Sequence, residues 1–363
     1  MTGSGPRAGY GRAVSTAPAH AGPDAPRPGI EATPPRRDLV RRLAWANLAA
    51  QIGIIVTGGA VRLTGSGLGC STWPQCEPGE FTPRFHAATP AHTYIEFGNR
   101  TLTGLLGVIA LALAVVVWRE RGPLPAWYRR LAVVPLAGVA AQAVIGGVTV
   151  LMKLDPAVVG LHMLVSLVLV ATSTVLVARR PGAPRRVILE PMGGRLVEAL
   201  SAVAIVLMVL GIVTTGAGPH GGDEEYATRY AIDPVLAAKL HAGAVWLFGA
   251  LLLACLVVLA RTRAVGRATM RPWWVLLGVT VAQGAIGYLQ YFTGLPEVIV
   301  GAHLLGTGLL VAALTWARST VVPPAILTPL TLDATPRVML GRDTGAPAPR
   351  VRPAADPPSP GRG

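Results

Sequence analysis

The chain has 363 residues, of which 52% are hydrophobic and 14% charged, and its formal net charge is +14. The hydrophobic residues gather in blocks of about twenty, the length needed to cross the hydrocarbon core of a bilayer. A water-soluble helical protein would show a polar face at every turn, which these blocks lack, so the composition excludes that class. The arginines are scattered between the blocks, and a nucleic-acid partner is therefore not expected.

Eight blocks predict an all-α membrane protein with eight transmembrane helices. The expected spans are 43–61, 95–118, 131–152, 157–177, 196–215, 235–260, 273–292 and 298–317. Residues 1–36 and 319–363 are rich in proline, glycine, alanine and arginine, and we expect them to be disordered tails.

The basic residues predict the orientation in the membrane. The loops after the second, fourth and sixth spans hold thirteen arginines, whereas the loops at the other ends hold four basic residues and eight acids. Cytoplasmic loops carry an excess of lysine and arginine, so both termini are expected in the cytoplasm of a multi-pass protein of the cell membrane.

The first outer loop contains the sequence Cys70-Ser-Thr-Trp-Pro-Gln-Cys76. Two cysteines this close on the oxidising side of a membrane favour a disulfide. The alternative is a zinc site, which needs two further ligands, and His86 and His92 are available for it. The third cysteine, Cys255, lies within a span and is interpreted as a small apolar residue of the packing.

The second span begins with Glu96 and Asn99, which are three residues apart and share one helix face. A carboxylate at the membrane boundary has two interpretations. It is either an interfacial anchor or, if it faces a cofactor cavity, a proton acceptor or a charge that stabilises an oxidised intermediate.

Part of the chain repeats at a constant offset of 141 residues over a stretch of about thirty positions. Gln142, Leu154 and His162 of the first copy correspond to Gln283, Leu295 and His303 of the second. At an offset of 142 the second span aligns with the sixth, which places Asn99 opposite His241. The repeat divides the chain into two four-helix halves, 37–180 and 181–318. Because each half has an even number of spans, we expect a pseudo-twofold axis along the membrane normal.

Three histidines, His162, His241 and His303, lie in apolar spans near their outer ends. Ionisable groups are costly there and usually face a cavity or a partner. Neutral imidazoles across a four-helix bundle suit axial ligation of haem iron, with His241 and His303 as the pair of the second half. The alternative is a buried histidine that is bonded to a carbonyl oxygen.

These residues carry a resemblance to the haem A synthase family. The chain resembles it in Thr64-Gly65-Ser66-Gly67-x-Gly69-Cys70, in Trp73-Pro74-x-Cys76, in Ile95-Glu96-Phe97-x-Asn99-Arg100 and in the repeated histidine helices. Together these motifs span roughly residues 45–315, which include all eight helices.

The resemblance implies a haem-oxidising membrane enzyme. It implies that the C8 methyl of haem O becomes the formyl group of haem A through hydroxylated intermediates. His162 would hold the iron of haem O, Glu96 would be the essential carboxylate, and His241 and His303 would hold a resident haem b. The family's haem O synthase, a farnesyltransferase, and cytochrome oxidase assembly would lie upstream and downstream. The electron donor is not implied, and a homo-oligomer is compatible with the pattern.

The chain departs from the family pattern at two places. The pattern has a second histidine three residues after the glutamate, where this chain has Asn99, so we expect one protein ligand on the substrate iron. His92, two helical turns earlier, is the alternative ligand. The second outer loop has the sequence 218–223 in place of a second cysteine pair.

Two other classes compete with the enzyme. One is a non-catalytic di-haem cytochrome b that only carries electrons, for which Glu96 and the cysteine loop have no evident use. The other is a transporter built on a parallel repeat, which would not require matched ligands.

Overall fold

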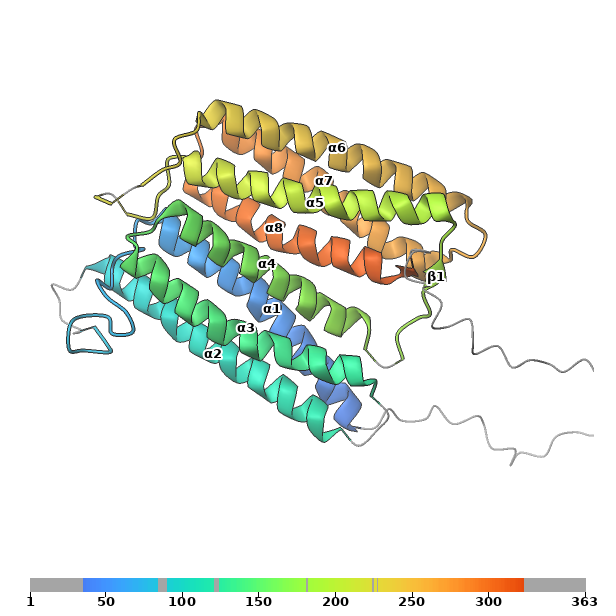
Figure 1. Cartoon of the computed structure of the whole chain (residues 1–363), viewed down its shortest axis with the longest axis horizontal. Helices are drawn as coiled ribbons and strands as arrows, with labels where there is room; N and C mark the ends of the chain where they lie inside the picture. Colours follow the sequence, from blue (N-terminus) through green and yellow to red (C-terminus); the bar gives the residue numbers. More distant parts are fainter. Residues whose placement is uncertain are drawn as a thin grey trace, which may run out of the picture.

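Eight long helices form the protein, which we describe from a computed structural model covering residues 35–83, 90–120, 124–180, 182–223, 225–226 and 228–322 (Figure 1). They are α1 (Pro35–Leu63), α2 (Ala91–Arg119), α3 (Ala126–Leu151), α4 (Pro156–Ala178), α5 (Pro191–Ala217), α6 (Pro234–Arg261), α7 (Arg267–Phe292) and α8 (Glu297–Ser319). All eight are long and apolar enough to cross a membrane, which confirms the predicted all-α multi-pass architecture. The two predicted tails lie outside the described residues, apart from their helix-proximal ends.

The helices form two four-helix groups that lie side by side (Figure 1). In the first group each helix contacts the next and α4 contacts α1, which closes a ring. In the second group α5 packs on α6, α6 on α7 and α7 on α8. The groups meet where α8 packs against α1 and α4, and where α4 packs against α5.

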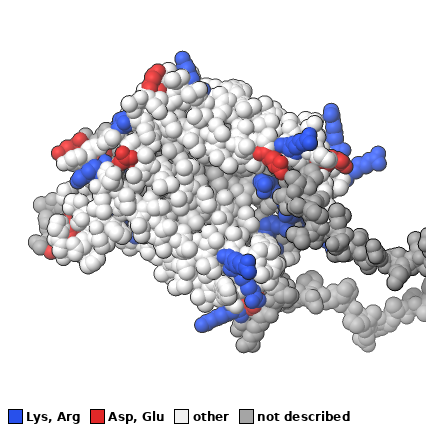
Figure 2. All heavy atoms as spheres, in the orientation of Figure 1, with Lys and Arg blue, Asp and Glu red and all other residues white. Residues whose placement is uncertain are grey.

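Each group has its own apolar core. Tyr128 and Leu113 are buried in the first core, and Phe248 and Trp273 in the second. Large apolar side chains also cover the outer faces, as the lipid environment requires. Charged side chains gather at the two ends of the helices, and the visible face has a largely uncharged band between them (Figure 2).

A short parallel pairing, absent from the all-α prediction, joins the two groups at one end. Strand β1 (Val187–Ile188), in the connection between α4 and α5, pairs with β2 (Val321–Val322), which follows α8. Two-residue strands carry no periodicity that a sequence pattern could reveal. They form here because the ends of α4, α5 and α8 are brought together.

The ends of α3 and α7 repeat one backbone conformation. Leu154 and Leu295 have positive φ angles of 61° and 62°, which are uncommon for residues other than glycine. The amide of Leu154 donates to Thr149 O and that of Leu295 to Gln290 O, both at 2.8 Å. This match supports the duplication at the level of helix pairs, while the pseudo-twofold axis for whole halves stays a prediction.

The buried hydrogen bond between α1 and α4 predicts a measurable coupling. Asn47 Nδ2 donates to Ser173 Oγ at 2.8 Å, and both side chains are buried. A double-mutant cycle of Asn47→Ala and Ser173→Ala, followed by unfolding of the full chain in mixed micelles, should give a coupling of about 0.6 kcal/mol, with about 1.7 kcal/mol as the upper end. The same cycle with Thr172→Ala, whose hydroxyl donates to Val168 O of its own helix, should give a coupling near zero. Equal coupling in both cycles would contradict the pairing.

Candidate functional site

A cavity of about 530 Å³ lies between the two helix groups and is lined by residues of all eight helices. Cofactor and small-molecule sites usually have volumes of roughly 300–1,000 Å³. The lining residues that can carry chemistry are Glu96, Asn99, Arg100, Gln142, His162, His241, Gln283 and His303. The sequence repeat predicts one site in each half, whereas in the structure both sets of residues border a single cavity.

Each of the three histidines packs against a glycine of the neighbouring helix. The pairs are His162 with Gly146, His241 with Gly211, and His303 with Gly287. A methyl group added at these glycines would come within 3.3, 3.1 and 3.5 Å of the imidazole Cε1, respectively. The glycines therefore make room for the rings beside the cavity.

A glutamine holds the helix backbone at two of the histidines. Gln142 Nε2 donates to His162 O at 2.9 Å and to Ser166 Oγ at 2.5 Å. In the second group Gln283 Nε2 lies 3.1 Å from His303 O and 3.5 Å from Thr307 Oγ1. The repeat pattern identifies the two glutamines as equivalent positions, and only the structure shows that both contact the backbone of a histidine helix.

The imidazoles carry buried nitrogens that lack a protein partner. Nδ1 of His162, His241 and His303 has no hydrogen bond within the described part of the chain, although the backbone of Leu207 approaches the His241 ring. An unsatisfied buried polar group costs about 1–3 kcal/mol. These buried Nδ1 atoms do not open onto the cavity, so a bound group would engage the rings through Nε2.

The donor set suits iron that is already bound by a porphyrin. Among the described residues no three histidine, cysteine or acidic side chains cluster closely enough to hold a bare metal ion. Haem iron needs only one or two axial ligands from the protein. His241 on α6 and His303 on α8 line the same cavity, as a ligand pair of one iron requires.

Asn99 lines the cavity but is engaged by α1. Thr57 Oγ1 donates to Asn99 Oδ1 at 2.8 Å. The alternative ligand His92 is directed to the outer loop, where its Nδ1 lies 2.9 Å from Ser66 Oγ, and it is not among the described cavity-lining residues. In the first group His162 is thus the imidazole that borders the cavity.

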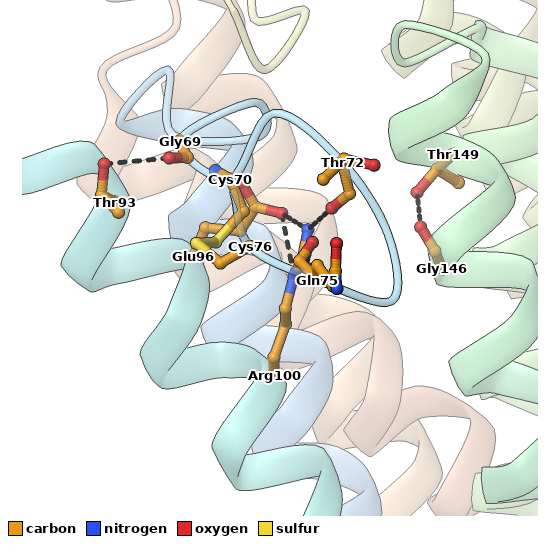
Figure 3. A network of polar contacts seen from close by, with 10 residues as sticks. All are labelled: Gly69, Cys70, Thr72, Gln75, Cys76, Thr93, Glu96, Arg100, Gly146 and Thr149. Atoms are coloured by element: carbon orange, nitrogen blue, oxygen red, sulfur yellow. Dashed lines mark hydrogen bonds and ion pairs between the residues drawn. A yellow bond between two sulfur atoms is a disulfide. The ribbon is translucent and has the colours of Figure 1, made fainter. Parts of the chain in front are cut away.

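The carboxylate of Glu96 connects α2 to the first outer loop (Figure 3). Glu96 is only 5% exposed. Oε2 accepts a hydrogen bond from the Cys70 amide at 2.6 Å, and Oε1 accepts one from Arg100 Nη2 at 2.6 Å. The structure therefore gives Glu96 the anchoring role that the sequence left open, on the wall of the cavity.

Arg100 extends this connection along the loop (Figure 3). Its guanidinium donates to Thr72 O at 3.1 Å and to Gln75 O at 3.2 Å. Trp73, between these two carbonyls, packs against the backbone at Gly147 and lines the cavity. The loop consequently forms the outer cover of the first helix group.

The predicted disulfide between Cys70 and Cys76 is confirmed. Both sulfurs are used by this bond, so the alternative of a zinc site is wrong. Its proposed ligand His86 lies outside the described residues. The disulfide closes the loop segment that Glu96 and Arg100 hold.

The second outer loop is held without cysteines. Gly222 O accepts a hydrogen bond from the amide of Gly67 at 2.8 Å, and Arg229 donates to Pro219 O. Arg62, at the end of α1, donates to Thr215 O at 2.7 Å. Hydrogen bonds to the first helix group therefore hold this loop in place. In the haem A synthase pattern, a second cysteine pair occupies the same loop.

The contact between Glu96 and Cys70 predicts a change in loop protection. Glu96→Gln removes the charge from two short hydrogen bonds, which should cost roughly 2 kcal/mol, or about thirtyfold in amide protection. Hydrogen exchange of peptides from residues 66–83 measures this loss. Glu77→Gln, in the same loop, is the control and should leave exchange of these peptides unchanged; unaltered exchange in Glu96→Gln would remove the anchoring role.

Comparison with known proteins gives the family. Residues 41–228 match the family of cytochrome oxidase assembly proteins. Haem A synthase of Bacillus pumilus is 34% identical over 130 residues, which are 36% of this chain and 41% of the relative. Haem A synthase of Lysinibacillus sphaericus is 35% identical over 136 residues, covering 35% of this chain and 41% of the relative. The match thus spans about two fifths of these relatives, and the family match covers more than half of the chain. The chain belongs to the family of cytochrome oxidase assembly proteins that includes the haem A synthases.

Proposed function

We propose that the protein is a haem A synthase that oxidises the C8 methyl of haem O to the formyl group of haem A. The observation that carries the proposal is the meeting of His162, His241 and His303 on one cavity between the helix groups. Two hydroxylations would convert the methyl to a gem-diol, each consuming one O₂, two protons and two electrons from the donor and releasing one water. Loss of a further water would leave the aldehyde. The matched relatives, which bear this enzyme name, support the same reaction.

In this proposal the second helix group holds a resident haem b between His241 and His303. When bound, this group supplies one-electron transfer to and from the substrate site. Gly211 and Gly287 leave space for the two rings, and Gln283 fixes the backbone of His303. These contacts orient both imidazoles before the group binds.

The first helix group holds the substrate through His162. Gln142 fixes the His162 backbone, as its counterpart does in the second group. Asn99 is bonded to Thr57 and supplies no second imidazole. We therefore assign His162 as the one protein ligand of the substrate iron.

Glu96 is the only acid among the described residues that line the cavity. We assign it the acceptance of a proton, or the stabilisation of positive charge, during oxidation of the methyl. Arg100 and the Cys70 amide hold the carboxylate in one position. Preorganised charge of this kind needs no rearrangement during reaction.

The proposed setting is the cell membrane with both termini in the cytoplasm, so that the disulfide loop covers the cavity on the outer side. A haem O synthase would supply the substrate and cytochrome oxidase assembly would consume the product. The electron donor is a further partner that the proposal requires.

A second candidate function is electron transfer by a di-haem cytochrome b. One observation favours it: both carboxylate oxygens of Glu96 are already used by Cys70 and Arg100. Under this interpretation the carboxylate would serve only to anchor the loop.

The assignment of haem b predicts a spectroscopic difference between repeat-related variants. His241→Ala and His303→Ala should each lose the low-spin spectrum of the two-ligand haem, with at least a tenfold loss of bound haem b, because one axial ligand is removed. His162→Ala is the matched control, since it occupies the same position in the other copy and should keep that spectrum. Retention of the spectrum in both second-group variants would refute the ligand pair.

The enzymatic proposal predicts formation of haem A in cells that supply haem O. His162→Ala and Glu96→Ala should lower conversion by about a hundredfold or more while haem b stays bound, because the ligand or the acid–base group is lost. Extracted haems are separated and quantified. Arg100→Gln separates the two roles of Glu96: a loss as large as that of Glu96→Ala assigns Glu96 to anchoring alone. Bound haem b with no haem A from the unmodified chain would support the electron carrier instead.

A further inference from the structure

A second hollow, a groove of about 850 Å³, lies between α4, α5 and α8. Its walls are apolar, with Val168 and Val175 on α4, Ile205 on α5 and Leu314 on α8. Val168 is 60% exposed and Ile205 is 68% exposed. These helices cross the membrane, so hydrocarbon chains of lipids are the surroundings that cover such walls.

Three arginines border the same groove: Arg179 directly after α4, Arg186 before β1 and Arg318 in the last turn of α8. In the described part of the chain no carboxylate forms an ion pair with them, and the described lining contains no acid. Burial, followed by repulsion from Arg179 and Arg318, lowers the pKa of the Arg186 guanidinium. The groove therefore joins an apolar trough to an uncompensated positive cluster.

The position of one guanidinium is fixed by the fold. Arg186 Nε and Nη2 donate to Val321 O at 3.0 and 2.8 Å, which ties the cluster to the β1–β2 pairing. Trp127, which is 45% exposed, also lines the groove. Tryptophan and arginine together are typical of the level of lipid headgroups.

We propose that this groove binds one anionic phospholipid, with its phosphate at Arg179, Arg186 and Arg318 and an acyl chain along the α4, α5 and α8 walls. Basic pockets between transmembrane helices recognise anionic headgroups in this way. A haem is the less suitable occupant, since the described lining offers no histidine or cysteine for iron. The acyl chain would lie across the junction of the two helix groups.

The groove also shares part of its wall with the central cavity. Leu167 and Met208 line both the groove and the central cavity. A bound acyl chain would therefore support the wall of the cavity from the lipid side. This role is independent of the reaction that the cavity performs.

The test measures retention of phosphatidylglycerol by the purified full chain in native mass spectrometry, with phosphatidylcholine as the uncharged competitor. Arg179→Gln/Arg318→Gln should lower the affinity for phosphatidylglycerol by roughly tenfold or more, because two headgroup charges are lost. This double variant leaves Arg186 unchanged, because its hydrogen bonds to Val321 O hold the β1–β2 pairing. Ala171→Phe, which fills the apolar wall without changing charge, should lower retention of both lipids.

The matched control is Arg261→Gln/Arg263→Gln, which removes the same charge from the end of α6 and the connection after it; neither residue lines the groove. Retention unchanged in this control, with loss in the groove variants, supports the proposal. Equal loss in both double variants, or displacement of phosphatidylglycerol by haem O, would overturn it. So would a rise in retention after removal of residues 323–363, since that result would make the chain's own end the occupant.

Discussion

Within a bilayer, a polar group buried among helices must be satisfied by the protein or by something the protein binds. Almost every polar contact that shapes this molecule follows from that constraint. Gln142 and Gln283 donate to the backbone of the histidine helices, and Asn47 donates to Ser173. Within the described residues, the amide oxygens of these three side chains and the Nδ1 atoms of the three cavity histidines have no hydrogen-bond partner. The histidine rings border the cavity, so they are the side chains that a bound group can engage.

The same constraint couples the structure of the outer loop to that of the cavity. Glu96 and Arg100 form an ion pair one helical turn apart on α2, and both also form hydrogen bonds with the loop backbone. Without the loop, the carboxylate would keep Arg100 but lose the hydrogen bond from the Cys70 amide. The loop in turn keeps Trp73 against Gly147. Any chemical role of Glu96 is therefore built on a contact that also holds the cover of the cavity.

The spans and the three cavity-lining histidines could be predicted from sequence because each depends on local composition or on the repeat. The helices extend up to eight residues beyond the predicted spans, as at Pro35, since flanking polar residues continue a helix without raising hydropathy. The union of two expected sites into one cavity could not be predicted, because it depends on how α8 packs against α1 and α4. The β1–β2 pairing and the loop contacts of Arg100 depend on tertiary proximity in the same way.

The difference between the two copies has a consequence for the proposed reaction. The sequence repeat places Asn99 opposite His241, and the structure bonds Asn99 to Thr57. An iron held between two imidazoles is bound on both faces and suits a cofactor that stays. An iron held by His162 alone has one imidazole ligand fewer. If the contacts to the porphyrin are equal, a haem bound in this way is released more easily than one held by two imidazoles. This chain has the histidine pair in one copy only, although the family pattern carries a second histidine at the position of Asn99. Under the proposed function, the site with the single imidazole of His162 is therefore the one suited to releasing its haem.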